Sequence, residues 1–324
     1  MMAAWIVPLA LAAAPLAGQP PGSVFDSVSQ QQQQPVDDTT QAQDVLIKKD
    51  PNDRMTVAVT LSGVGPFRFL VDTGADRTAI SSAVAARLGL DAGESATLHT
   101  MTGISTVRTA NVPKLQLSGS QIRIDEAPVL EAEKMGADGI LGTDSLRSQR
   151  VVFDFEKQVM TLVPSRKRAM PKEEGTIVVT GRLRNGRLIV TNAVADDQVI
   201  TVVLDTGSEV SVGNEAMRRR LIGSGLLKNS GQVELESVTG DLLTGDYVFV
   251  KKLELGEVTL ANLAVVFADA HTFRRLGLED RPALLLGMNA LRAFKKVSID
   301  FANKKLRLML PEHGSAAPLM MAAR

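Results

Sequence analysis

The sequence contains no cysteine and only three histidines, which removes several kinds of chemistry from consideration. Without cysteine there are no disulfides and no thiolate metal ligands. His99, His271 and His313 lie far apart and show no metal-ligand spacing, and we expect His99 to lie on the surface of a strand. Neither a phosphate loop ending in lysine nor a Gly-x-Ser-x-Gly motif occurs. We therefore expect no metal and no cofactor, and we look for the chemistry among the carboxylates.

The charge shows no excess of either sign. Lysine plus arginine and aspartate plus glutamate both number 36, so the chain lacks the basic excess typical of nucleic-acid binding. The 324 residues are 44% hydrophobic, which is enough for one large or two medium cores. The composition predicts a folded protein without a nucleic-acid partner.

The two ends of the chain differ in composition from the rest. Residues 1–18 form an apolar run that is too short for a comfortable membrane span and is similar to a secretory signal. No basic residue precedes this run, so an uncleaved membrane tether stays an alternative. Residues 19–44 are rich in Gln, Ser and Pro and predict a disordered tether, and residues 312–324 predict a flexible tail. We expect an exported protein, periplasmic or secreted.

The middle of the chain contains an internal repeat of two copies. Residues 66–90 are echoed by residues 199–223, with an offset of 205 minus 72, or 133 residues. Four further matches follow in the same order, and the last pairs residues 151–162 with 297–310. We expect a first lobe over residues 45–163, a linker over 164–175 and a second lobe over 176–311.

Each copy consists mostly of short alternating segments typical of β-strands. Met55 to Leu61 and Val199 to Leu204 are two of these segments, and Asn185-Gly186 is a strong hairpin signal. One short helix follows in each copy, over Ser81 to Leu88 and Asn214 to Leu221. The sequence predicts an all-β protein of two homologous β-barrel lobes related by a pseudo-twofold axis, with one short helix per lobe.

An Asp-Thr-Gly tripeptide ends an apolar strand in both copies, and the aspartates are Asp72 and Asp205. A carboxylate on such a rigid turn is held by backbone amides, while the threonine braces the turn from behind. Two such turns face to face can share one water, and their carboxyl groups cannot both be charged. The pair can hydrolyse a peptide bond by general acid-base catalysis. The residues expected to support the turns are Thr73, Gly74, Ala75, Thr206, Gly207 and Ser208.

The two turns differ at the residue after glycine, which is Ala75 in the first copy and Ser208 in the second. A Ser208 hydroxyl that donates to Asp205 would favour the charged carboxylate. Our hypothesis is that Asp205 is the ionised base and Asp72 its protonated partner.

The two Asp-Thr-Gly turns, each followed downstream by an apolar-apolar-Gly element ending at Gly142 or Gly287, resemble the retropepsin-like aspartic proteases. The resemblance covers both halves of residues 45–311 and implies two β-barrel lobes in one chain, a monomer, and an extended peptide bound under β-hairpin flaps. The stretches that match the flaps are 98–107 and 235–243. The residues that this resemblance suggests for substrate binding are Asp76, Glu209, Thr102, Gly103, Thr239 and Gly240.

The sequence therefore predicts a metal-free aspartic endopeptidase. Two alternatives stay open. One is a catalytically silent peptide-binding or adaptor protein of the same fold, and the other is a protease limited to processing its own tether.

Overall fold

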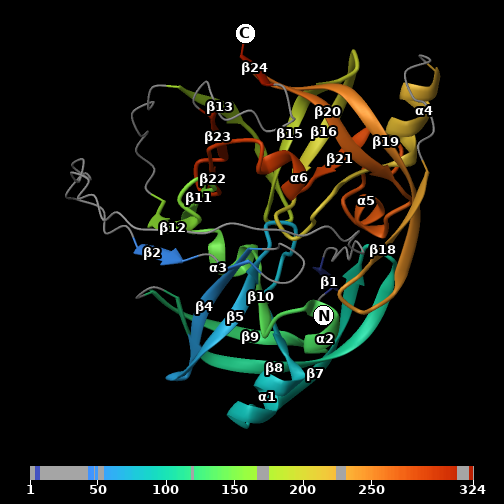
Figure 1. Cartoon of the computed structure of the whole chain (residues 1–324). Helices are drawn as coiled ribbons and strands as arrows, with labels where there is room; N and C mark the ends of the chain where they lie inside the picture. The colour runs from blue at the N-terminus through green and yellow to red at the C-terminus, as the bar shows by residue number, and fades with distance from the viewer. Residues whose placement is uncertain are drawn as a thin grey trace, which may run out of the picture.

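The computed structural model describes residues 4–7, 43–46, 48–49, 55–117, 120–165, 175–223, 231–311 and 321–323. Figure 1 shows a first lobe, drawn in blue to green, below a second lobe in yellow to orange, with a separate set of strands beside both. Most of the predicted tether and linker lies outside the described residues. No helix within the described ranges is long and apolar enough to cross a membrane.

The first lobe is a barrel of six strands that closes through a pairing between β4 and β8. The order around the barrel is β8-β9-β6-β10-β5-β4. The strands are β4 (Met55–Leu61), β5 (Val64–Val71), β6 (Ala79–Ser81), β8 (Ile104–Leu117), β9 (Ser120–Leu130) and β10 (Gly139–Leu141). Outside it, β7 (Ala92–Thr100) pairs with β8, β1 (Ala4–Val7) pairs with β7, and β3 (Lys48–Lys49) pairs with β4.

The second lobe repeats this barrel, and the pairing of β15 with β19 closes it. The order is β15-β16-β21-β17-β20-β19. The strands are β15 (Arg187–Ala195), β16 (Gln198–Leu204), β17 (Ser211–Gly213), β19 (Leu242–Leu255), β20 (Val258–Phe267) and β21 (Ala283–Leu286). Outside it lie β14 (Arg182–Arg184), β18 (Gln232–Glu236) and β24 (Met321–Ala323), which belongs to the predicted tail and pairs with β20.

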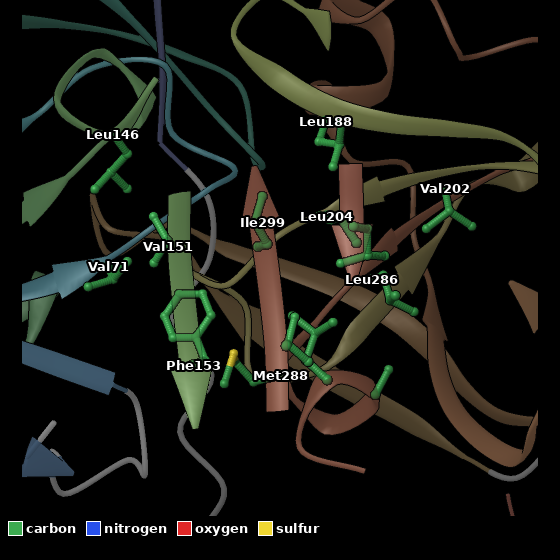
Figure 2. Close-up of a cluster of buried hydrophobic side chains, with 14 of the residues drawn as sticks. Val71, Leu146, Val151, Phe153, Leu188, Val202, Leu204, Leu286, Met288 and Ile299 are labelled. Atoms are coloured by element: carbon green, nitrogen blue, oxygen red, sulfur yellow. The ribbon is translucent and has the colours of Figure 1, made fainter. Parts of the chain in front are cut away.

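A third sheet joins the two lobes. Its order is β13-β23-β22-β11-β12-β2, symmetric about the central antiparallel pair β11 and β22. The strands are β2 (Gln43–Leu46), β11 (Gln149–Asp154), β12 (Val159–Pro164), β13 (Thr176–Thr180), β22 (Lys296–Asp300) and β23 (Lys305–Met309). Figure 2 shows Val151 of β11 and Ile299 of β22 between buried side chains of the first lobe, such as Val71, and of the second, such as Leu204. One continuous apolar core therefore holds the lobes in a set orientation.

The two predicted helices are present. In α1 (Ser82–Leu88) the Ser81 hydroxyl accepts the Val84 N–H at 3.1 Å, and Gly89 ends the helix with φ 57°. In α4 (Glu215–Gly223) Asn214 plays the same capping part, since its Oδ1 accepts the Met217 N–H at 2.9 Å.

The expectation of one helix per lobe was wrong, because the described chain has three in each. The additional helices are α2 (Ala132–Met135), α3 (Thr143–Leu146), α5 (His271–Arg275) and α6 (Met288–Leu291). Each is about one turn long, which is too short to show a 3.6-residue hydrophobic period.

Candidate active site

Each predicted catalytic aspartate follows directly after a buried central strand. β10 runs parallel to β5 and accepts the Asp72 N–H at the carbonyl of Leu141, at 3.0 Å. β21 does the same in the second lobe, where the Asp205 N–H donates to the carbonyl of Leu286 at 3.0 Å. The apolar-apolar-Gly elements thus anchor the start of both turns, so the aspartates leave the sheets at equivalent points.

The threonines lock the two turns to each other. The Thr73 hydroxyl donates to the carbonyl of Leu204 at 3.1 Å and accepts the Thr206 N–H at 3.1 Å. The Thr206 hydroxyl donates to the carbonyl of Val71 at 2.8 Å and accepts the Thr73 N–H at 3.0 Å. Each threonine therefore braces the opposite turn, whereas the sequence predicted that it braces its own. The crossed bonds fix the two turns face to face.

The two carboxyl groups lie against the opposite glycines. A Cβ atom on Gly74 would lie 2.5 Å from Oδ1 of Asp205, and one on Gly207 would lie 2.6 Å from Oδ1 of Asp72. No other residue type leaves room for the opposing carboxyl group, since real Cβ contacts are never this close. Both aspartates are buried. The structure thus brings together the pair that the repeat singled out.

Backbone amides hold both carboxyl groups. Oδ1 of Asp72 accepts the N–H groups of Gly74 at 2.8 Å and Ala75 at 2.9 Å. Oδ1 of Asp205 accepts the N–H of Gly207 at 3.1 Å, and its Oδ2 has no hydrogen-bond partner within the described chain. One buried oxygen at the centre of the site therefore has unused hydrogen-bonding capacity.

The two carboxyl groups differ in their electrostatic surroundings. Burial, reinforced by the charge of Asp205, raises the pKa of Asp72 well above its usual value. Burial also raises the pKa of Asp205, to about 6, and here the charge of Arg187 is the strongest opposing influence. The pair therefore holds one proton over a wide pH range, with Asp72 as its main carrier.

Arg187 is the residue that sequence reasoning missed. It is the first residue of β15 and fully buried, and its Nε donates to the carbonyl of Gly74 in the opposite lobe. Its Nη1 and Nη2 have no hydrogen-bond partner among the described residues, although the charges of Asp76, Asp72 and Asp205 all stabilise the guanidinium. An arginine next to an Asn-Gly hairpin turn normally indicates a solvated position, so no local signal reveals its burial.

Ser208 does not play its predicted part. Its hydroxyl donates to the carbonyl of Val210 at 2.7 Å, within its own turn, and not to Asp205. The proposed order, with Asp72 as the protonated partner and Asp205 as the ionised base, agrees with the direction of the pKa shifts. The proposed cause, a hydrogen bond from the Ser208 hydroxyl to Asp205, is wrong. Arg187 lowers the pKa of both aspartates, but it is the strongest opposing influence on Asp205 and the weakest on Asp72, whose pKa the charge of Asp205 also raises.

The other predicted site residues fall into two groups. Thr102-Gly103 and Thr239-Gly240 lie at the tips of the β7–β8 and β18–β19 hairpins, as expected of turns. Glu209 is half-buried and paired with Arg292, whose Nη1 lies 2.7 Å from its Oε2. Asp76 is half-buried and acts electrostatically on Arg187. These two acidic residues thus have charged partners inside the protein.

Two family models match the chain in tandem. The model described as gag-polyprotein aspartyl protease matches residues 57–148, and the aspartyl protease model matches residues 190–290. Each match contains one Asp-Thr-Gly turn and one apolar-apolar-Gly element. The chain belongs to the retropepsin-like aspartic protease family. A search of curated proteins found no match. The resemblance drawn from the motifs is confirmed, and so is the duplicated all-β fold.

Proposed function

We propose that this protein is an aspartic endopeptidase that hydrolyses peptide bonds with Asp72 and Asp205. The supporting observation is the pair of buried carboxyl groups, locked face to face and unequal in pKa. Two carboxyl groups that titrate apart are what general acid-base catalysis near neutral pH requires.

In this mechanism the charged Asp205 takes a proton from a water molecule as the water oxygen attacks the carbonyl carbon of the peptide. The protonated Asp72 donates its proton to the carbonyl oxygen, so no free oxyanion builds up. The tetrahedral diol collapses when Asp72 takes that proton back and the nitrogen of the leaving amine receives the proton held by Asp205. The C–N bond breaks and both carboxyl groups return to their starting states.

The substrate class and assembly follow from the same geometry. An extended peptide can lie between the lobes beneath the two hairpins, and both carboxyl groups come from one chain, so the site is complete in a monomer. We also propose export to the periplasm or the cell exterior, supported by the apolar run of residues 1–18. Cell fractionation of the full chain and of a chain starting at residue 19 tests that part.

The activity is tested with purified protein and a denatured protein substrate at pH 4 to 7. Asp72→Asn and Asp205→Asn should each lower the cleavage rate by roughly a hundredfold or more, whereas the exposed Asp91→Asn should leave it unchanged. Equal rates in all four proteins would refute the proposal. Substrate binding without cleavage would support the silent peptide-binding alternative.

Mass spectrometry distinguishes cleavage of other proteins from the alternative in which the protein processes only its own tether. If cleavage is confined to the tether, residues 19–44 disappear from the wild type and persist in Asp72→Asn, while added proteins stay intact.

A further inference from the structure

The two flap hairpins cross to the opposite lobe in matching ways. Met101 and Val238 occupy equivalent tip positions, one residue before the Thr-Gly pair, and both are buried. Met101 packs into an apolar cluster of the second lobe that includes Ile189 and Phe273. Val238 packs into a cluster of the first lobe that includes Ile140. The structure therefore describes a closed state in which each tip is held by the other lobe.

These two clusters border the catalytic turns. Ala75, directly after the first Asp-Thr-Gly, belongs to the cluster that receives Val238. Val210, just beyond the second turn, belongs to the cluster that receives Met101. A peptide that reaches the carboxyl groups needs this apolar space for its side chains, so the flaps must lift before a substrate can bind.

The first flap has a polar fastening in addition to Met101. The backbone N–H of His271, at the start of α5, donates to the carbonyl of Met101 at 2.7 Å. On the same contact, Nδ1 of His99 and Nε2 of His271 are 2.7 Å apart, and the rings are parallel within 3° with centroids 5.0 Å apart. His99 is on β7 of the flap, as expected of a strand residue, and its side chain is half-buried.

A hydrogen bond between two imidazoles has a strict proton requirement. One nitrogen must carry a hydrogen and the other must offer a lone pair, so the bond survives with both rings neutral or with one charged. When both rings are charged, all four nitrogens are donors and the bond is lost. Two adjacent positive charges then repel each other as well.

The surroundings of the pair favour neutral rings. Burial and the charges of His271 and Arg275 lower the pKa of His99. Burial and the charges of Arg274 and Arg275 lower the pKa of His271, and the charge of Asp269, which pairs with Arg274 at 2.7 Å, is the smallest influence and raises it.

The residues that pair with His99 on the neighbouring strands do not titrate. The backbone partners of His99 are Ile104 on β8 and Ile6 on β1.

We propose that His99 and His271 form a proton-sensitive latch, which holds the first flap shut over the cleft at neutral pH and releases it when acid protonates both rings. Its consequence for catalysis rests on the proposed function, but the latch itself does not. In the closed state both histidines bind protons more weakly than a free ring, whose pKa is about 6.5. The closed state is therefore fully favoured above that pH and loses its advantage as the pH falls below it. Each ring contributes up to about tenfold per pH unit to opening.

The test measures flap position in a catalytically inactive chain. Asp72→Asn with Asp205→Asn removes the titrating pair of the active site and any self-cleavage. Because the chain has no cysteine, a spin label can be placed on the flap at Ile104→Cys, 61% exposed, and on the second lobe at Val199→Cys, 67% exposed. Pulsed dipolar spectroscopy should give one short distance at pH 8 and a growing longer component at pH 6, 5.5 and 5.

A matched variant pair separates protonation from packing. His99→Asn with His271→Gln places amide groups near Nδ1 and Nε2, which can hydrogen-bond but cannot titrate in this range. This protein should keep the short distance from pH 8 to 5. His99→Ala, which removes the bond altogether, should already show the longer component at pH 8, and it covers the case in which the amide pair fails to fold.

Two results would overturn the latch. One is a single distance at every pH in the protein with both histidines, and the other is equal opening with acid in the amide variant. Labels at Leu242→Cys on the second flap and Val64→Cys on the first lobe give an internal control, because their distance should not depend on the histidines. All measurements are made on a catalytically inactive protein, so the distances can be interpreted even if the proposed peptidase activity is wrong. A failure of the latch would likewise leave the test of peptidase activity unaffected.

Discussion

Replacing Arg187 by methionine should move the pH dependence of catalysis upward. The guanidinium is fully buried, bonds to Gly74 and opposes the pKa rise of Asp205 more than any other group. Methionine fills similar space without the charge. The fixed charge that favours ionised Asp205 is then lost, so the base needs a higher pH to lose its proton.

Coulomb's law gives the order of magnitude of the effect. Arg187 bonds to the carbonyl of the glycine against which Asp205 packs. Two unit charges about 7 Å apart at an effective dielectric constant of about 20 interact by about 2.4 kcal/mol. That energy corresponds to about 1.7 pKa units. Starting from a pKa of about 6, the ionised fraction of Asp205 at pH 5 should fall about fiftyfold, but less than twofold at pH 8.

The assay is kcat/KM against pH from 4 to 9 on a fluorogenic peptide found by library digestion. The acidic limb should shift up by one to two units, roughly, in Arg187→Met. The basic limb should also rise, because Arg187 lowers the pKa of Asp72 too. Arg187→Lys keeps the charge and is the matched control.

Two outcomes would refute this reasoning. One is an acidic limb that stays in place in a folded Arg187→Met protein, as judged by circular dichroism. The other is an equal shift in Arg187→Lys, which would show that the shape of the side chain matters and not its charge.

Three further predictions concern the crossed turns. Thr206→Val should lower the unfolding free energy by about 2 to 5 kcal/mol in urea titration, because it leaves the Thr73 N–H and the Val71 carbonyl buried without the threonine hydroxyl as a partner. Thr206→Ser keeps the hydroxyl and is the control. Equal losses of unfolding free energy in the two variants would contradict this prediction. Burial raises the pKa of Asp205 in the native state to about 6 from 3.8, so stability should fall as the pH rises from 4 to 6. Asp205→Asn should flatten that fall, and an unchanged slope would show that this group is not its source. Gly207→Ala should abolish cleavage while far-ultraviolet circular dichroism stays native, since its methyl group displaces the opposite carboxyl group; retained activity would disprove the tight contact.

The sequence by itself determined the features that repeat. Two strands ending in Asp-Thr-Gly, two apolar-apolar-Gly elements and two capped helices predicted the duplicated fold and singled out Asp72 and Asp205. Such signals are local, because strand periodicity, glycine turns and capping residues act within a few positions of one another. Because of the duplication each signal occurs twice, which allowed it to be recognised in the sequence.

Only the tertiary structure decided the contacts between the lobes. The threonines brace the opposite turn, Arg187 reaches the glycine of the other lobe, and His99 of the first lobe meets His271 of the second. None of these contacts leaves a local pattern, because each partner lies more than a hundred residues from the other. Burial then gives these side chains their electrostatic effect, and burial depends on how the two barrels pack together.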